Sequence, residues 1–368
     1  MPMCSRLMTV VVSFAVCGLA QRVSFQRIVT REFPGASIVG GSLLPPESGQ
    51  PPRLVSWGDR IRLHQIPKGR SGELSGYRNF GPGGCLLDVN QDGAADLVLY
   101  EQSAIAGETG RMVWLASPEW TLNLIDSQAD FNDCLATTLF GSPGVLIIHR
   151  QSQVRFYQVP ADRSARWPYR EIYSIYTPSA QGGLLRADVD GDGHLDIFVG
   201  NYWLKAPDQD AQPWKLYAIN QWWNTPRSAM LRLATAKPLD TPFPILFAAE
   251  SEASPARLAW FERPADPTQL WLETRLDALP PLRRPHAVAT ADLNGDMRPE
   301  LVVGENSGAG SRLLIYWSLG SGKYQGTRVD VVPGIRGLWM YDYDSDGDSD
   351  IIGIGPRHFY VWRHQRRR

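Results

Sequence analysis

The sequence has only four cysteines and six histidines, and no apolar run after residue 20 is long enough to cross a membrane. Its net charge of −1 leaves no basic footprint, which argues against a nucleic-acid partner. No stretch keeps a helical periodicity long enough to indicate alternating strands and helices. The chain also lacks Gly-x-Ser-x-Gly, His-Glu-x-x-His and a phosphate-binding loop, so none of the enzyme classes that these motifs mark is indicated.

Residues 1–20 have the pattern of a secretory signal peptide. Arg6 supplies a positive charge, residues 8–17 form an apolar run of suitable length, and residues 18–20 include small residues at a cleavage position. An uncleaved segment that anchors the chain at a membrane surface is the alternative. The sequence predicts a secreted, periplasmic or cell-surface protein, with residues 21–368 as a single, monomeric domain.

A nine-residue acidic segment occurs four times. The copies occupy residues 88–96, 188–196, 292–300 and 342–350, and are called here the first to fourth acidic loops. Their first residues are 100, 104 and 50 positions apart, which indicates a unit of about 50 residues with further units in the wider gaps. Three more units without the full acidic set are found by their spacing, at residues 36–66, 134–148 and 246–261. The chain therefore contains seven units.

Each unit contains short apolar segments rich in Val, Ile, Leu, Tyr and Trp, separated by Gly or Pro, which is typical of β-strands. Buried strands are expected directly after the acidic loops, at residues 97–100, 197–200, 301–304 and 351–354. A later strand carries an aromatic residue, predicted to be Trp114, Tyr217, Trp260, Tyr316 or Trp362. Three to four strands per unit predict an all-β, seven-bladed β-propeller. Residues 23–30 can complete the last unit and so close the ring.

Removal of residues 1–20 leaves two cysteines, Cys85 and Cys134, which occupy equivalent positions in successive units. An oxidising compartment permits a disulfide between them. A disulfide and a pair of buried thiols both remain open.

The acidic loops follow the pattern Asp-x-Asp/Asn-x-Asp-Gly-x-x-Asp. Side-chain oxygens at positions 1, 3, 5 and 9 and the carbonyl at position 7 can converge on one Ca²⁺ ion, and glycine at position 6 permits the sharp turn. The expected ligands are Asp88, Asn90, Asp92, Ala94 and Asp96; Asp188, Asp190, Asp192, His194 and Asp196; Asp292, Asn294, Asp296, Arg298 and Glu300; and Asp342, Asp344, Asp346, Asp348 and Asp350.

The third loop departs from the pattern, because Met297 replaces the glycine and Glu300 replaces the last aspartate. We expect it to bind calcium more weakly. A helix–loop–helix calcium site is excluded because position 12 falls within a strand-like apolar run. Turns that hold no metal are the remaining alternative.

These segments, above all residues 188–200, resemble the FG-GAP/VCBS repeat family, whose members include the integrin α-subunit head. The resemblance implies a seven-bladed propeller with calcium between the first two strands of certain blades. It does not imply one function, because the family includes adhesion modules, carbohydrate-binding domains and catalytic propellers of polysaccharide lyases.

The face opposite the acidic loops offers two hypotheses. Glu101, Asn201, Glu250 and Glu305, beside Tyr202 and Trp203, are expected there as a ring that binds a glycan or a protein without catalysis. Alternatively, His286 with Arg284 or Arg336 supplies the base and the cation of a polysaccharide lyase. A purely structural part of a larger surface assembly is a third class, which the sequence does not separate from the first.

Overall fold

The computed structural model describes residues 23–45, 52–67, 71–74, 76–176, 182–222, 230–238, 243–276, 278 and 280–366. The predicted signal peptide lies outside these residues. Among the residues described, no helix has the length and apolar character needed to cross a membrane.

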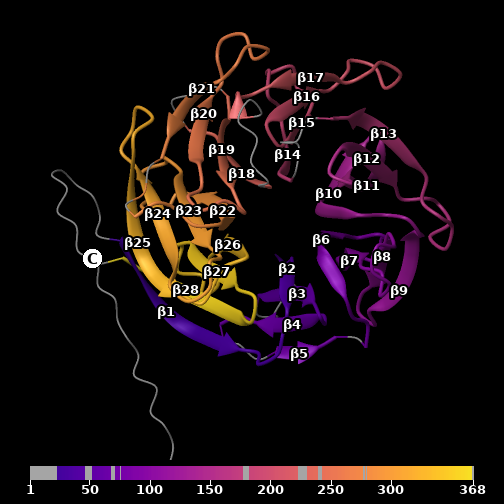
Figure 1. Cartoon of the computed structure of the whole chain (residues 1–368), viewed down its shortest axis with the longest axis horizontal. Coiled ribbons are helices and arrows are strands. Elements are labelled where there is room, and N and C mark those ends of the chain that lie inside the picture. Colours follow the sequence, from indigo (N-terminus) through magenta and orange to yellow (C-terminus); the bar gives the residue numbers. More distant parts are fainter. Residues whose placement is uncertain are drawn as a thin grey trace, which may run out of the picture.

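The described chain forms seven four-stranded antiparallel sheets arranged as blades around a central axis (Figure 1), which confirms the predicted β-propeller. The innermost strands are β2 (Ile38–Leu43), β6 (Phe80–Leu87), β10 (Phe131–Leu139), β14 (Leu184–Ala187), β18 (Leu231–Ala236), β22 (Pro285–Ala291) and β26 (Gly337–Tyr341). The second strands are β3 (Arg53–Gly58), β7 (Asp96–Glu101), β11 (Ser142–His149), β15 (Asp196–Val199), β19 (Ile245–Glu250), β23 (Glu300–Glu305) and β27 (Asp350–Ile354).

The outer half of each blade completes the sheet. The third strands are β4 (Arg62–Gln65), β8 (Arg111–Ala116), β12 (Gln153–Gln158), β16 (Tyr202–Lys205), β20 (Leu258–Glu262), β24 (Ser311–Ser318) and β28 (His358–Arg366). The outermost strands are β5 (Ser71–Glu73), β9 (Thr121–Asp126), β13 (Tyr169–Ser174), β17 (Lys215–Ala218), β21 (Leu272–Arg275), β25 (Tyr324–Val332) and β1 (Val23–Glu32).

The core is divided among the spaces between neighbouring blades. In one such cluster, Val98 and Trp114 of the second blade pack against Ile147 and Tyr157 of the third. Second strands such as β19 are buried at every position, because both faces of the strand meet an adjacent blade. This explains why these segments are continuous apolar runs in the sequence and not alternating ones.

The ring closes by pairing the two ends of the described chain, as predicted. β1 pairs antiparallel with β28 and becomes the outer strand of the seventh blade, as Figure 1 shows. Phe25 of β1 is buried in the same cluster as Trp362 of β28. A salt bridge of 3.2 Å joins Arg27 to Asp330 of β25, so β1 also contacts the sixth blade.

The fourth blade corrects one aromatic assignment. Tyr217 lies on the outer strand β17, whereas the equivalent third-strand residue is Trp203 of β16. A two-residue turn joins β15 directly to β16, because Val199 pairs with Tyr202. Trp203 is therefore a buried core residue and not part of a surface on the opposite face.

Cys85 of β6 and Cys134 of β10 form a disulfide, with a Cα–Cα distance of 5.4 Å. Of the two alternatives left open by the sequence, the structure has the disulfide. The bond joins the innermost strands of the second and third blades, which hydrogen bonding within each sheet does not connect.

His64 of β4 is a fully buried histidine in the first blade. Its ring lies 2.8 Å from Ser56 Oγ and 2.7 Å from Ser71 Oγ, and it stacks on Phe359 with the ring centroids 5.0 Å apart. Burial, with help from the charges of Arg62 and Arg31, lowers the pKa of His64 to about 3.

This histidine is expected to make the stability of the folded protein sensitive to mild acid. The pKa of His64 is lower in the folded state than in the unfolded state. The neutral ring therefore contributes fully to the free energy of unfolding above pH 6.5, and this contribution is lost as the pH falls towards 3. Between pH 7.5 and pH 5 the loss amounts to about 2 kcal/mol, for an unfolded pKa of about 6.5. Denaturant unfolding at both pH values measures it. The variant His64→Gln is expected to lose about 2 kcal/mol less over this interval, and an equal loss in both proteins would contradict the assignment.

Candidate metal centres

All four acidic loops connect the first strand of a blade to its second strand, in the second, fourth, sixth and seventh blades. Because the innermost strands are equivalent in every blade, the loops emerge at the same end of the ring. The propeller thus presents its acidic segments on one face, as the repeat predicts.

The ninth residue of each loop is its buried centre. These carboxylates are at most 1% exposed, and they are Asp96, Asp196, Glu300 and Asp350. Each accepts a hydrogen bond from the backbone N–H of loop position 2, at 2.8–3.3 Å. Each also accepts one from a backbone N–H at the end of the third strand, donated by Ser117, Ala206, Ser318 and His364. The same backbone arrangement therefore recurs in all four loops.

The exposed part of each loop is held by its own carboxylates. The position-1 carboxylate accepts a hydrogen bond from the N–H of position 6, at 2.8–3.2 Å. The position-5 carboxylate accepts one from the N–H of position 7, at 2.8–3.0 Å; the donors are Ala94, His194, Arg298 and Asp348. The predicted role of the position-7 carbonyls as ligands stays a prediction.

Two positions in each loop adopt a left-handed backbone. Position 6 has a φ of 85–89° in the three loops that place glycine there, and Met297 is forced to a φ of 64° in the third. Position 4 is also left-handed, a requirement that the sequence pattern did not reveal because Gln91 and Ser345 occupy it in two loops. The third loop therefore carries the backbone strain expected from its missing glycine.

Two of the four loops bring three carboxylates together. The groups are Asp188, Asp190 and Asp196 in the second loop and Asp342, Asp344 and Asp350 in the fourth. Within each group, the ligand oxygens all lie within 4.8 Å of one another, so each group could hold a metal ion. In both loops the fifth-position aspartates, Asp192 and Asp346, are not members of these groups.

The first and third loops differ because asparagine stands at position 3. The Asn90 side-chain nitrogen donates to Asp92 at 2.8 Å, and the Asn294 side-chain nitrogen lies 3.3 Å from Glu300 Oε1. The structure therefore places the predicted residues of these loops, including Asp88, Asp292 and Asp296, in the same backbone arrangement but does not gather three of their acids into one group.

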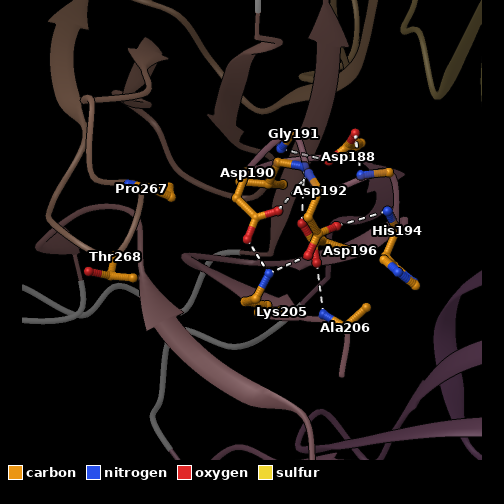
Figure 2. A network of polar contacts seen from close by, with 12 residues as sticks. Asp188, Asp190, Gly191, Asp192, His194, Asp196, Lys205, Ala206, Pro267 and Thr268 are labelled. Atoms are coloured by element: carbon orange, nitrogen blue, oxygen red, sulfur yellow. Dashed lines mark hydrogen bonds and ion pairs between the residues drawn. The ribbon is translucent and has the colours of Figure 1, made fainter. Parts of the chain in front are cut away.

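A basic side chain reaches into each of the two gathered groups, and the sequence analysis missed both. Lys205, the last residue of β16, forms ion pairs with Asp190 and Asp192 in the second loop (Figure 2). Arg363 of β28 lies 2.8 Å from Asp344 in the fourth loop. The corresponding residues of the first and third loops are Ala116 and Trp317. A cation from the third strand thus accompanies aspartate at position 3, and a neutral residue accompanies asparagine.

The buried carboxylates are held in an environment that disfavours their charge. Burial, with a smaller effect from neighbouring aspartates, raises the pKa of Asp196 and of Asp350 to about 6. The same cause raises the pKa of Glu300 to about 8 and moves the pKa of Asp96 upwards. A nearby cation favours the ionised form of such groups, so the donor set suits a hard divalent ion.

On the face opposite the acidic loops, the acids that were predicted to form a ligand-binding ring are paired with arginines instead. Glu250 and Glu305 are 2% and 0% exposed. Each carboxylate pairs with an arginine at the beginning of the third strand of the same blade. Arg257 donates to Glu250 at 2.6 Å, and Arg312 donates to Glu305 at 2.5 Å. The same pairing joins Glu101 to Arg111.

These acids fix the turn between the second and third strands and do not form an open ring. Asn201 is likewise only 1% exposed. The spacing Glu-x₆-Arg, shared by residues 250–257 and 305–312, is the signal in the sequence that could have identified the pairs.

The residues considered for a lyase do lie near one another. His286 Nε2 lies 2.8 Å from Glu252 Oε1, and Arg284 lies 2.5 Å from the other oxygen of the same carboxylate. Burial works to raise the pKa of Glu252, but His286 and Arg284 outweigh it and lower that pKa to about 2. Glu252, which the sequence analysis did not select, therefore pairs with both groups. Its charge also acts on Arg336, although no ion pair joins Arg336 to a carboxylate among the described residues.

The comparison with known families supports the repeat assignment. Residues 292–353 match the family model described as an FG-GAP-like repeat, a segment that contains both the third and the fourth acidic loops. The chain carries an FG-GAP-like repeat. Together with the seven-bladed fold, this match fits an FG-GAP, integrin-α-like propeller. A search of curated proteins found no match to the chain. The FG-GAP propeller fold supports, in general terms, a module for binding or interaction.

Proposed function

We propose that this FG-GAP propeller is an exported, calcium-binding and non-catalytic module that binds a protein or a glycan. The observation that carries the proposal is the gathering of three carboxylates in each of the second and fourth acidic loops. Closely packed carboxylates repel one another unless a cation joins them, and calcium prefers several oxygen ligands in a flexible loop.

Calcium in this position would brace the loop and, through the position-9 carboxylate, the strands beneath it. Asp196 contacts the N–H of Val189 at 3.0 Å and that of Ala206 at 2.7 Å, so it links the loop to the third strand. An ion bound to the same carboxylate stabilises the folded blade, because the unfolded chain does not hold these oxygens together.

Lys205 and Arg363 partly neutralise the aspartates of the second and fourth loops when no calcium is bound. Each lies against the position-3 aspartate, which is an expected calcium ligand. A calcium ion at this aspartate competes with the basic side chain, since both need the same oxygens. The two side chains therefore weaken calcium binding and keep the acidic loops ordered before the ion arrives.

Export agrees with the disulfide between Cys85 and Cys134, because such bonds persist mainly in oxidising compartments. In this proposal the protein works as a monomer outside the cytoplasm, where calcium is abundant. Its rigid blades present a binding surface, and no catalytic step is required of them.

Isothermal titration calorimetry with calcium chloride, after chelator treatment, tests the proposal. We expect dissociation constants of about 10⁻⁴ to 10⁻³ M, as in extracellular calcium modules. Asp188→Asn and Asp342→Asn are each expected to remove one of the two stronger sites. Asp208→Asn, at an exposed aspartate outside the acidic loops, serves as the matched control and should leave the titration unchanged.

The variant Lys205→Met is expected to act in the opposite direction. Removing the ion pairs of Lys205 with Asp190 and Asp192 should tighten calcium binding at the second loop by roughly fivefold, the equivalent of about 1 kcal/mol. A titration without calcium heat in the wild-type protein, or one that the loop variants leave unaltered, would contradict the calcium assignment.

A further inference from the structure

A cavity of about 240 Å³ lies among the innermost strands of the propeller, on the face opposite the acidic loops. Residues of β2, β6, β10, β18, β22 and β26 line it, and these strands surround the centre of the ring in Figure 1. Its charged lining residues lie at the beginnings of these strands, whereas the acidic loops follow their ends. The cavity is therefore separate from the proposed calcium sites.

Among the described charged groups at the cavity, one arginine has no carboxylate as an ion-pair partner. Arg232 pairs with Asp133 at 2.9 Å, and the Arg284–Glu252 pair lies beside His286. Burial lowers the pKa of His286, and the neighbouring Glu252 acts against this shift. Two cation–anion pairs therefore cancel, and Arg336 remains.

Arg336 lies immediately before β26, is half-buried and lines the cavity. Among the described residues, no carboxylate lies within ion-pair distance of its guanidinium, and its Nε has no hydrogen-bond partner. A buried N–H donor that lacks an acceptor is costly, and the planar donors of a guanidinium match the two oxygens of a carboxylate.

An indole forms the apolar part of the lining. Trp339 is partly buried and packs so closely over Gly337 that a Cβ there would come within 2.5 Å of the ring. A Cβ at Gly41 of the neighbouring blade would come within 3.3 Å of the same ring. Glycine at both positions lets the indole lie against the inner strands, so the cavity combines a flat apolar surface with a cation.

We propose that this cavity binds a small carboxylate, with Arg336 holding the carboxylate group and Trp339 contacting the body of the ligand. The inference rests on the proposed binding role, whose ligand class it names, but not on calcium. The one arginine without an ion-pair partner among the described residues matches a monoanion, and the nearby carboxylates of Asp133 and Glu252 disfavour a dianion such as phosphate. The volume suits one small acid, because it is below the range of about 300–1,000 Å³ that is usual for drug-sized ligands.

Calorimetric titration of the full chain, in calcium-containing buffer, tests the proposal with matched charged and neutral probes. Benzoate is compared with benzamide, and glucuronate with glucose; each pair differs mainly in the carboxylate. We expect at least one acid to bind, and its neutral counterpart to bind at least roughly tenfold more weakly. A preference for benzoate indicates that the natural ligand is an aromatic acid, and a preference for glucuronate indicates a sugar acid. Failure of both acids to bind, or equal binding of the neutral probes, overturns the proposal.

Variants then assign the binding to the cavity. Arg336→Met is expected to weaken binding of the acid by roughly tenfold or more, and Arg336→Lys by less, because lysine keeps the charge without the planar donors. Arg275→Met, at a 63% exposed arginine of β21, is the matched control and should bind as the wild type does. Equal binding by the Arg336 variants, with their folding checked by circular dichroism, overturns the assignment even where the wild type binds.

The calcium-loop variants separate this inference from the calcium proposal. Asp188→Asn is expected to lose a calcium site and to keep the affinity for the acid. An absent calcium response with intact acid binding contradicts the calcium proposal alone, whereas an intact calcium response without acid binding contradicts the cavity proposal alone.

Discussion

Deletion of residues 23–32 is expected to remove the sharp cooperative unfolding transition of the propeller. These residues form β1, the outer strand of the seventh blade, which is paired with β28 along its length. Without β1, the seventh blade has an unpaired edge, and the first and last parts of the chain are no longer joined by strand pairing. Denaturant unfolding followed by circular dichroism measures the change.

Replacing a single side chain of β1 tests the contribution of this strand quantitatively. Phe25 is 6% exposed and lies in a cluster with Tyr360 and Trp362 of β28. Replacing a buried phenylalanine by alanine costs about 3–5 kcal/mol, so Phe25→Ala should lower the free energy of unfolding by that amount.

Thr30→Ala, at an exposed position of β1, provides the control and should change stability little. If Phe25→Ala and Thr30→Ala had equal effects, β1 would not be part of the core, and the closed ring would have to be abandoned.

The disulfide is expected to contribute a comparable amount to the free energy of unfolding. Cys85 and Cys134 are separated by 49 positions, and closing a loop of this length lowers the entropy of the unfolded chain by the equivalent of about 4 kcal/mol. The double variant Cys85→Ser/Cys134→Ser should therefore be less stable by about 4 kcal/mol in denaturant unfolding.

Chemical reduction supplies the matched control. A reducing agent should destabilise the wild-type protein by about as much as the double replacement does, and should leave the double variant unaffected. Equal stability of the wild type with and without reductant would show that the bond does not form in solution.

Much of the fold followed from local patterns in the sequence. The recurring acidic segment and the short apolar runs after it indicated seven blades, because each blade repeats the same order of turn and strand. The ring closure through residues 23–30 followed from the missing outer strand of the last unit. Tyr217 was misassigned because the turn before β16 is two residues long, which moves Trp203 into the third strand.

The acidic loops were predicted better than the opposite face. In the second and fourth loops the carboxylates at positions 1, 3 and 9 lie close together, because the nine-residue turn fixes its own geometry. The full ligand sets stay a prediction. The partners of Glu250 and Glu305 come from the following strand, and the spacing within one loop says nothing about that pairing. Lys205 was missed for the same reason, since it reaches the second loop only after two strands have folded against each other.

Thermal unfolding of the full chain with calcium and with chelator tests most directly the claim that the acidic loops bind calcium and stabilise the propeller. Binding to the folded state alone contributes about 2.7 kcal/mol per site when calcium exceeds the dissociation constant a hundredfold. We expect a calcium-specific rise in melting temperature of several degrees, which equal magnesium does not reproduce and which Asp188→Asn/Asp342→Asn largely abolishes. An unchanged melting temperature with calcium would show that the gathered aspartates are metal-free turns, and would contradict the account.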